Sequence, residues 1–170
     1  MERQKWTAHI FNLNIDPGWT TNILTRVRDT EIRIEQYCKD LTDTQLSFRT
    51  EGAWSIKEHI GHLIDLEALH HQRVIEFGIL KKELSAADMS NAKTEAANHN
   101  SKSLDILLGE FRKAREAFIY DFQMLPKVSL YHEAMHPRLK VLMKPVDLLF
   151  FVAEHDDHHL ASIMELKRQI

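Results

Sequence analysis

The last predicted helix carries a pair of histidines whose spacing suits metal binding. In the segment FVAEHDDHHLASIMEL, His155 and His159 lie four residues apart. At about 100° per residue on a helix, both fall within the apolar stripe that contains Leu148, Val152 and Leu166. Two imidazoles one turn apart on the same face can bind one ion. We therefore predict a metal site at this pair, with hydrogen-bonded core histidines as the alternative.

Histidine is also unusually frequent in this chain, with 11 among 170 residues. Neutral imidazole is the commonest side-chain metal ligand near neutral pH. A metal in a helical core normally needs a further ligand from a facing helix, and one other segment offers four histidines: His59, His62, His70 and His71. Helical periodicity places His59 and His70 nearer the centre of the apolar face and His62 on its flank. The pattern alone therefore leaves the third ligand open.

Four segments have the apolar periodicity of long helices. They run from residue 18 to 39, from Ser55 to about residue 80, from Ser101 or Ser103 towards Pro126, and from about Pro145 to the C-terminus. The links cover 41–54, 82–100 and 126–144, and the second is long enough to hold a short helix. No strand-like alternation persists. Four amphipathic helices of about 20 residues predict an all-α four-helix bundle, formed as one domain over 1–170.

Bulk properties exclude several classes of protein. The net charge is -3, from 22 basic and 25 acidic side chains, and no basic cluster suits a nucleic acid. No apolar run reaches the roughly 20 residues that a membrane span requires. The first ten residues, MERQKWTAHI, lack the apolar stretch of a signal peptide. The single cysteine, Cys38, fits a reducing compartment. We therefore expect a cytoplasmic protein without nucleic-acid or membrane partners.

Two motifs resemble those of the DinB-like superfamily. They are WSIKEHIGHL at residues 54–63 and HDDHHL at residues 155–160, and the likeness extends from Trp19 to the last helix. This superfamily includes S-transferases that use low-molecular-weight thiols and proteins named as metal-dependent hydrolases. The resemblance implies a four-helix bundle with one divalent metal ion bound by His62, His155 and His159. Zinc, nickel and similar ions are associated with the family, so the identity of the metal stays open.

Three hypotheses for the function follow. Three histidine ligands leave a position for water or substrate. This favours a metal-dependent enzyme, either a thiol S-transferase or a hydrolase, that acts on a small molecule. The candidate substrate is a low-molecular-weight thiol, and the candidate assembly is a homodimer. The absence of an evident general base supports a non-catalytic metal-binding or stress-response protein instead. A two-metal carboxylate bundle is disfavoured, because Glu67 and His70 form one Glu-x-x-His motif but the last helix lacks a second.

Other side chains near the motifs have simpler expected roles. Trp54 is expected to pack over the end of the bundle, with substrate contact as the alternative. We expect Asp65 and Glu67 on the solvated surface, with an outer role at the metal as the alternative. His132 and His136 are expected in a surface loop, from which they could approach the open side of the metal.

Overall fold

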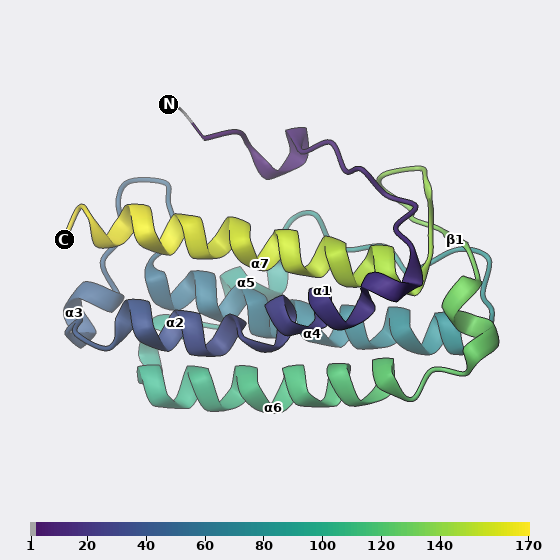
Figure 1. The fold of residues 1–170 in the computed structure, drawn as a ribbon. Helices are drawn as coiled ribbons and strands as arrows, with labels where there is room; N and C mark the ends of the chain where they lie inside the picture. Colours follow the sequence, from purple (N-terminus) through teal and green to yellow (C-terminus); the bar gives the residue numbers. More distant parts are fainter. Residues whose placement is uncertain (1–2) are drawn as a thin grey trace.

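Four long helical segments lie side by side in the computed structural model, which describes residues 3–170 (Figure 1). In chain order they are α1 (Thr20–Arg28) with α2 (Thr30–Cys38), α4 (Ile56–Gly78), α6 (Leu104–Gln123) and α7 (Pro145–Lys167). Helix α4 contacts both α6 and α7, and α1 contacts the same two helices. Helices α4 and α6 run in one direction and the other two segments in the opposite direction. The predicted all-helical bundle is confirmed, and its topology requires a long return link between α4 and α6.

The first segment was predicted as one helix, but the structure divides it at Asp29. Here the carbonyl of Arg26 accepts hydrogen bonds from the Thr30 hydroxyl at 3.2 Å and from the Arg33 guanidinium at 3.1 Å. Side-chain bonds of this kind compete with the backbone ladder and bend helices. The bend also lets the Thr30 hydroxyl donate to Asp156 of α7 at 2.8 Å. The prediction of an unbroken helix was therefore wrong.

The three links contain short elements of their own. Helix α3 (Asp43–Leu46) lies in the first link and α5 (Ala92–Ala96) in the second, where a short helix was expected. The third link forms a two-stranded antiparallel ladder between β1 (Ala134–Met135) and β2 (Leu142–Met143). We did not predict these strands, because two residues are too few to show alternation. Single 3-10 turns occur at Trp6–Ala8, Pro17–Trp19, His99–Ser101 and Lys127–Tyr131.

Local hydrogen bonds fix where the two histidine-bearing helices begin. At the start of α4, the Ser55 hydroxyl accepts from the Glu58 amide at 3.2 Å and the Glu58 carboxylate accepts from the Ser55 amide at 2.8 Å. This is the predicted capping box. At the start of α7, Pro145 occupies the first turn and Asp147 accepts from the Lys144 amide at 2.9 Å. These starts set the rotational phase of the histidines further along each helix.

The apolar core consists of two clusters, one towards each end of the bundle. One is centred on residues such as Phe77, Phe118 and Leu148, and the other on residues such as Ile60 and Phe111. On both α4 and α7, buried polar residues lie between the two clusters; they are Glu67, His70, His155, Asp156 and His159. A polar layer therefore crosses the middle of the bundle. No helix in residues 3–170 combines the length and apolarity needed to cross a membrane.

Candidate metal centre

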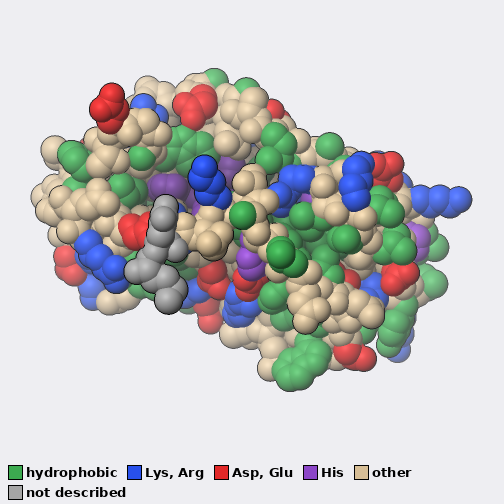
Figure 2. Space-filling model, turned by 90° about the horizontal axis from the view of Figure 1, so that it is seen from above, with side chains coloured by type: hydrophobic (Ala, Val, Ile, Leu, Met, Phe, Trp, Pro, Cys, Tyr) green, Lys and Arg blue, Asp and Glu red, His purple; other side chains and the backbone are tan. Residues whose placement is uncertain are grey.

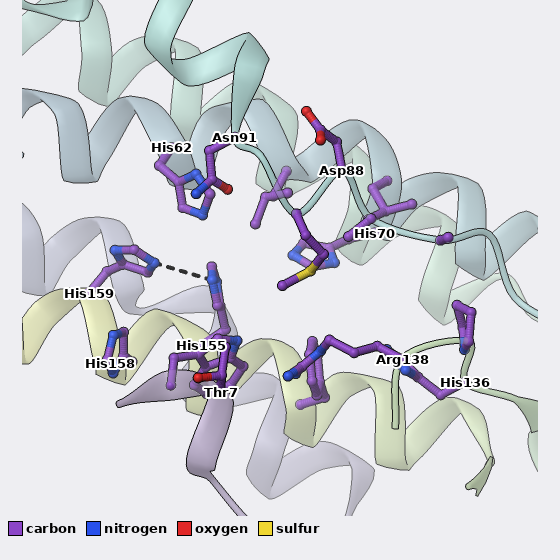
Figure 3. A pocket seen from close by; sticks show the side chains of 18 of the residues that line it. Thr7, His62, His70, Asp88, Asn91, His136, Arg138, His155, His158 and His159 are labelled. Atoms are coloured by element: carbon purple, nitrogen blue, oxygen red, sulfur yellow. Dashed lines mark hydrogen bonds between the residues drawn. The ribbon is translucent and has the colours of Figure 1, made fainter. Parts of the chain in front are cut away.

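Three buried histidines meet at the edge of this polar layer: His155 and His159 of α7, which belong to it, and His62 of α4 (Figure 3). Each is only 5 or 6% exposed, and each offers a ring nitrogen such that the three lie within 4.8 Å of one another. The Nε2 atoms of His155 and His159 are 3.2 Å apart. Since zinc–imidazole bonds are about 2.0–2.1 Å long, adjacent ligand nitrogens should be roughly 3–3.4 Å apart. This histidine triad therefore fits a single divalent ion.

The outer nitrogen of His62 is held by a chain of hydrogen bonds. His62 Nδ1 lies 3.1 Å from Thr94 Oγ1, on the short helix α5, and the Thr94 hydroxyl donates to Asp65 Oδ2 at 3.0 Å. His62 Nδ1 is then the donor, which leaves its Nε2 free to bind an ion. The same Asp65 oxygen lies 2.9 Å from His99 Nε2. Outer partners of this type fix the tautomer and orientation of a metal-binding histidine.

A glycine allows His99 to approach α4 this closely. A Cβ atom placed at Gly61 would lie 2.1 Å from Cγ of the His99 ring, far inside any real contact distance. His99 itself is 2% exposed. The ring therefore occupies the space that a side chain at position 61 would fill, and its contact with Asp65 depends on that space.

The other histidines of α4 flank the triad without completing it. His59 Nδ1 lies 2.9 Å from His159 Nδ1, on the side of the ring away from His155. The His70 ring centroid is 6.5 Å from that of His155. The Nδ1 atoms of His70 and His155 are buried and have no hydrogen-bond partner within the described part of the chain. Of the four candidates on α4, only His62 is placed with a ligand atom near both histidines of α7.

Burial keeps the triad in its neutral form. It lowers the pKa of His62 to about 4, while Asp65 opposes this and His99 adds to it. Burial likewise lowers the pKa values of His155 and His159 well below the ordinary value, and neighbouring imidazoles lower them further. An imidazole must be neutral to bind a metal ion. At neutral pH the three rings are therefore ready to bind.

Two hollows give access to the triad. The larger, of about 530 Å³, is lined by all three histidines, and its other walls include Trp6, Leu66, Met89, Arg138 and Phe151. The smaller, of about 440 Å³, shares Trp54, His158 and His159 with it and also reaches Arg3 and His59. In Figure 2, histidine surface is visible in recesses between hydrophobic and basic side chains. A bound ion would therefore remain accessible to small molecules.

Comparison with known proteins identifies the family. The model of the DinB superfamily matches residues 26–163 of this chain. The chain belongs to the DinB superfamily. The resemblance predicted from the two histidine motifs is thereby confirmed.

Solved structures show the same DinB bundle. The chain is similar to YfiT from Bacillus subtilis, described as a "probable metal-dependent hydrolase with an unusual four-helix bundle topology", with a TM-score of 0.80, 18% identity, and coverage of 95% of this chain and 93% of that one. It is also similar to a mycothiol-dependent maleylpyruvate isomerase, with a TM-score of 0.67, 11% identity, and coverage of 85% of this chain and 60% of that one. No curated protein matches. At these identities the two structures establish a common fold.

A buried ion cluster lies beside the triad in the DinB bundle. Arg115 of α6 donates to Glu67 at 3.0 and 2.6 Å and to Asp156 at 2.6 and 3.1 Å, and also to the Val27 carbonyl at 2.8 Å. Arg115 and the two carboxylates are each at most 2% exposed. Asp156 is the residue after His155, so this Arg115 cluster fixes the part of α7 that carries the triad. Sequence analysis did not predict it.

Three surface expectations were wrong. Glu67 is buried because Arg115 neutralises it. The Asp65 side chain is 8% exposed, because the chain between α4 and α6 folds over it and supplies Thr94 and His99 as partners. His136 is 2% exposed and lines the larger hollow. The outer role kept as the alternative for Asp65 agrees with these contacts.

Trp54 and His132 lie close to their expected places. The Trp54 ring centroid is 4.8 Å from that of His62, and its Nε1 donates to Glu95 at 2.7 Å. It packs on the bundle as predicted. It also lines both hollows, where the alternative interpretation, contact with a substrate, remains a prediction. His132 stays in its loop, with Nε2 2.8 Å from the Lys81 carbonyl oxygen.

The N-terminal segment contributes to the site, although sequence analysis assigned it no role. It runs along α7 in Figure 1, where Arg3 donates to the His158 carbonyl at 2.8 Å and to the Ser162 hydroxyl at 2.9 Å. The Trp6 ring centroid lies 5.0 Å from that of His155. An isolated tryptophan in a polar stretch was the available signal, but nothing in the sequence indicated which helix it would contact.

Proposed function

We propose that this protein is a metal-dependent enzyme with one divalent ion bound by His62, His155 and His159. The observation that carries the proposal is the convergence of three buried, neutral imidazoles beside an accessible hollow. Catalytic metal sites typically have three protein ligands and one open position, whereas structural sites are closed. Nitrogen ligands suit zinc and nickel among the common divalent ions.

The ion would lower the pKa of a bound water or hold a thiol as its thiolate. The chain's own residues would orient the ligands and shape the space around them. Thr94 and Asp65 hold the His62 ring with its free nitrogen towards the triad. Trp54 packs against His62 and Trp6 against His155, so aromatic surface borders the triad.

The reaction class is proposed from the neighbours together with the site. A metal-dependent hydrolase and a thiol-dependent isomerase share the fold. This supports hydrolysis or thiol transfer on a small molecule, with a low-molecular-weight thiol as the candidate. One observation favours a non-catalytic metal-binding role instead: three carboxylates near the triad in sequence, Asp65, Glu67 and Asp156, already accept hydrogen bonds from protein groups.

Elemental analysis of protein purified without an affinity tag tests the metal site. We expect about one divalent ion per chain, with most of it lost in His155→Ala and in His159→Ala. The matched control is His132→Ala, which removes a histidine outside the triad and should retain the metal. Circular dichroism shows whether each variant keeps its helices. Unchanged metal content in both triad variants would contradict the site.

Cobalt substitution tests the reaction class. If a thiol binds the ion directly, the cobalt-loaded protein should develop a sulfur-to-metal charge-transfer band when that thiol is added. His62→Ala should not show the band. If none of the common cellular thiols perturbs the spectrum, the thiol-transferase hypothesis is excluded. An assay for turnover of ester and amide substrates then distinguishes a hydrolase from a non-catalytic protein.

A further inference from the structure

The larger hollow contains basic side chains that the proposed metal chemistry does not use. Arg73, His136 and Arg138 line it together with the triad. Figure 3 shows His136 and Arg138 on the opposite side of the view from His62 and His159, with the Arg138 side chain extending into the hollow. The hollow therefore has a basic end as well as a metal-binding end.

Arg138 has no acidic partner among residues 3–170. Its Nη2 atom is buried without a hydrogen-bond acceptor. Its guanidinium carbon lies 6.0 Å from the ring centroid of Trp6 and 5.9 Å from that of Phe151, and these rings support the group. Burial lowers the pKa of Arg138. The side chain as a whole is half-buried, but its Nη2 atom is enclosed without an acceptor, so this atom can donate to an anion in the hollow.

His136 presents a second unpaired donor. Its Nδ1 accepts a hydrogen bond from the Leu139 amide at 3.2 Å, so in the neutral ring the proton resides on Nε2. That Nε2 atom is buried and has no partner within the described residues. Arg73, which is 2% exposed, donates through Nε and Nη2 to the Ser85 carbonyl at 3.0 and 2.9 Å rather than to a carboxylate.

Asp88 lines the same hollow, but its carboxylate is already engaged. It accepts from the Ser90 amide at 2.9 Å, the Ser90 hydroxyl at 2.6 Å and the Ala92 amide at 3.0 Å. Figure 3 shows this side chain directed away from the hollow. Arg73 has Glu76 as an acidic neighbour, so the positive charge that remains available to a ligand is that of Arg138.

We infer that Arg138 and His136 form a binding subsite for a carboxylate of the substrate. A planar guanidinium matches the two oxygens of a carboxylate. The walls of the same hollow include Leu66, Leu69 and Phe151, which suit a short apolar part of the ligand. A hollow of about 530 Å³ is of the size that binds small molecules. That the other end of the ligand carries a reacting group towards the triad rests on the proposed function. The binding of a carboxylate at Arg138 and His136 does not rest on it.

Calorimetric titration with hexanoate and hexanamide tests this inference. The two probes have nearly the same shape and differ in charge. In chelator-treated protein, hexanoate should bind about tenfold or more tightly than hexanamide, because a charged hydrogen bond is lost with the amide. Equal affinities, or no binding of hexanoate, would overturn the subsite. Tighter binding of butyl phosphate than of hexanoate would replace carboxylate by phosphate as its ligand.

Variants of Arg138 locate the binding. Arg138→Met should weaken hexanoate binding about tenfold or more, and Arg138→Lys should fall between this variant and the wild type because it keeps the charge without the planar fork. Arg28→Met removes an exposed arginine outside both hollows and should have no effect. Circular dichroism checks that each variant is folded. Unchanged affinity in both Arg138 variants would overturn the assignment.

Metal content separates this inference from the proposed function. Arg138→Met should retain its divalent ion, whereas His155→Ala should lose the ion and still bind hexanoate. Hexanoate binding that requires the metal and ignores Arg138 would mean that the carboxylate binds the ion, which overturns the subsite alone. A wild-type protein without metal would overturn the proposed function and leave the subsite standing.

Discussion

The histidine triad and the Arg115 cluster lie in the same polar layer but differ in how their polar atoms are satisfied. Arg115 donates to two carboxylates and a backbone carbonyl, so its charge is compensated within the protein. In the triad, the facing nitrogens of His155 and His159 can only share one proton, and His155 Nδ1 has no partner in the described chain. The Arg115 cluster also has one buried oxygen without a partner in the described chain, Glu67 Oε2, so the clusters differ mainly in charge. The Arg115 cluster pairs a cation with carboxylates and holds helices together, whereas the triad brings together neutral imidazoles that can bind a cation.

Both clusters draw on the same two helices, and adjacent residues belong to different clusters. His155 faces α4 and the larger hollow, while Asp156 points to α6 and α2 through Arg115 and Thr30. One turn of α7 therefore contributes to both. The Arg115 cluster therefore fixes the position of the triad. Substitutions in the Arg115 cluster should mainly affect stability, and substitutions in the triad should mainly affect metal binding.

The largest expected effect is a loss of stability when the Arg115 cluster is broken. Arg115→Met leaves Glu67 and Asp156 buried without a counter-charge, and should lower the free energy of unfolding by about 3–5 kcal/mol. Lys113→Met, two residues earlier on the same helix, removes an exposed cation and should have little effect. Urea denaturation measures both. Equal stability of the two variants would remove the distinction between a structural and a ligand-binding cluster.

The next largest effect is a loss of metal affinity when the triad loses its α4 histidine. His62→Ala should weaken zinc binding by more than about 100-fold, because it removes a ligand, whereas His59→Ala removes a neighbour of His159 and should cost about tenfold or less. Competition with a zinc-sensitive dye measures both. A larger loss in His59→Ala would mean that the periodicity of α4, and not the family motif, identifies the ligand.

A smaller effect is expected from the partners behind His62. Asp65→Asn and Thr94→Val disturb the hydrogen-bond chain that orients the ring, and each should weaken zinc binding about tenfold. Asp40→Asn, an exposed position away from the triad, is the control. Affinities equal to the wild type in both variants would show that helix packing alone positions His62.

Stability should also depend gradually on pH. Burial lowers the pKa values of His59 and His62 to about 4, whereas an unfolded histidine titrates near pH 6.5. As the pH falls from 6.5 towards 4, the unfolded chain binds protons that the folded chain does not, so the free energy of unfolding of metal-free protein should decrease. Urea denaturation at pH 8, 6.5 and 5 tests this. Constant stability over that range would mean that these rings take up protons in the folded protein as readily as in the unfolded chain.

The sequence predicted those parts of the fold and site that depend on local pattern. Apolar periodicity located the long helices, and the capping box at Ser55 located the start of α4. The pairing of His155 with His159 followed from one helix alone. His62 could be selected only through the family motif, because the choice among the α4 histidines depends on the rotation of one helix against another.

Features that depend on contacts between distant segments could not be predicted. Arg115 looks like an ordinary surface residue of an amphipathic helix until its two carboxylates are placed around it. Asp65 changes from a solvated to a buried residue because α5 covers it. Arg138 and Trp6 reach the larger hollow from a loop and from the N-terminal segment, whose paths have no periodic signal.

Gly61 limits how far this sequence can vary. Replacing it with any larger residue forces the His99 ring away, and the displacement passes to Asp65, Thr94 and His62 in turn. The position holds no ligand and borders neither hollow, yet it should tolerate no other amino acid without disturbing the outer support of the metal site. A library randomised at residue 61 and selected for metal retention should therefore return glycine, although a selection for folding alone would accept alanine as well.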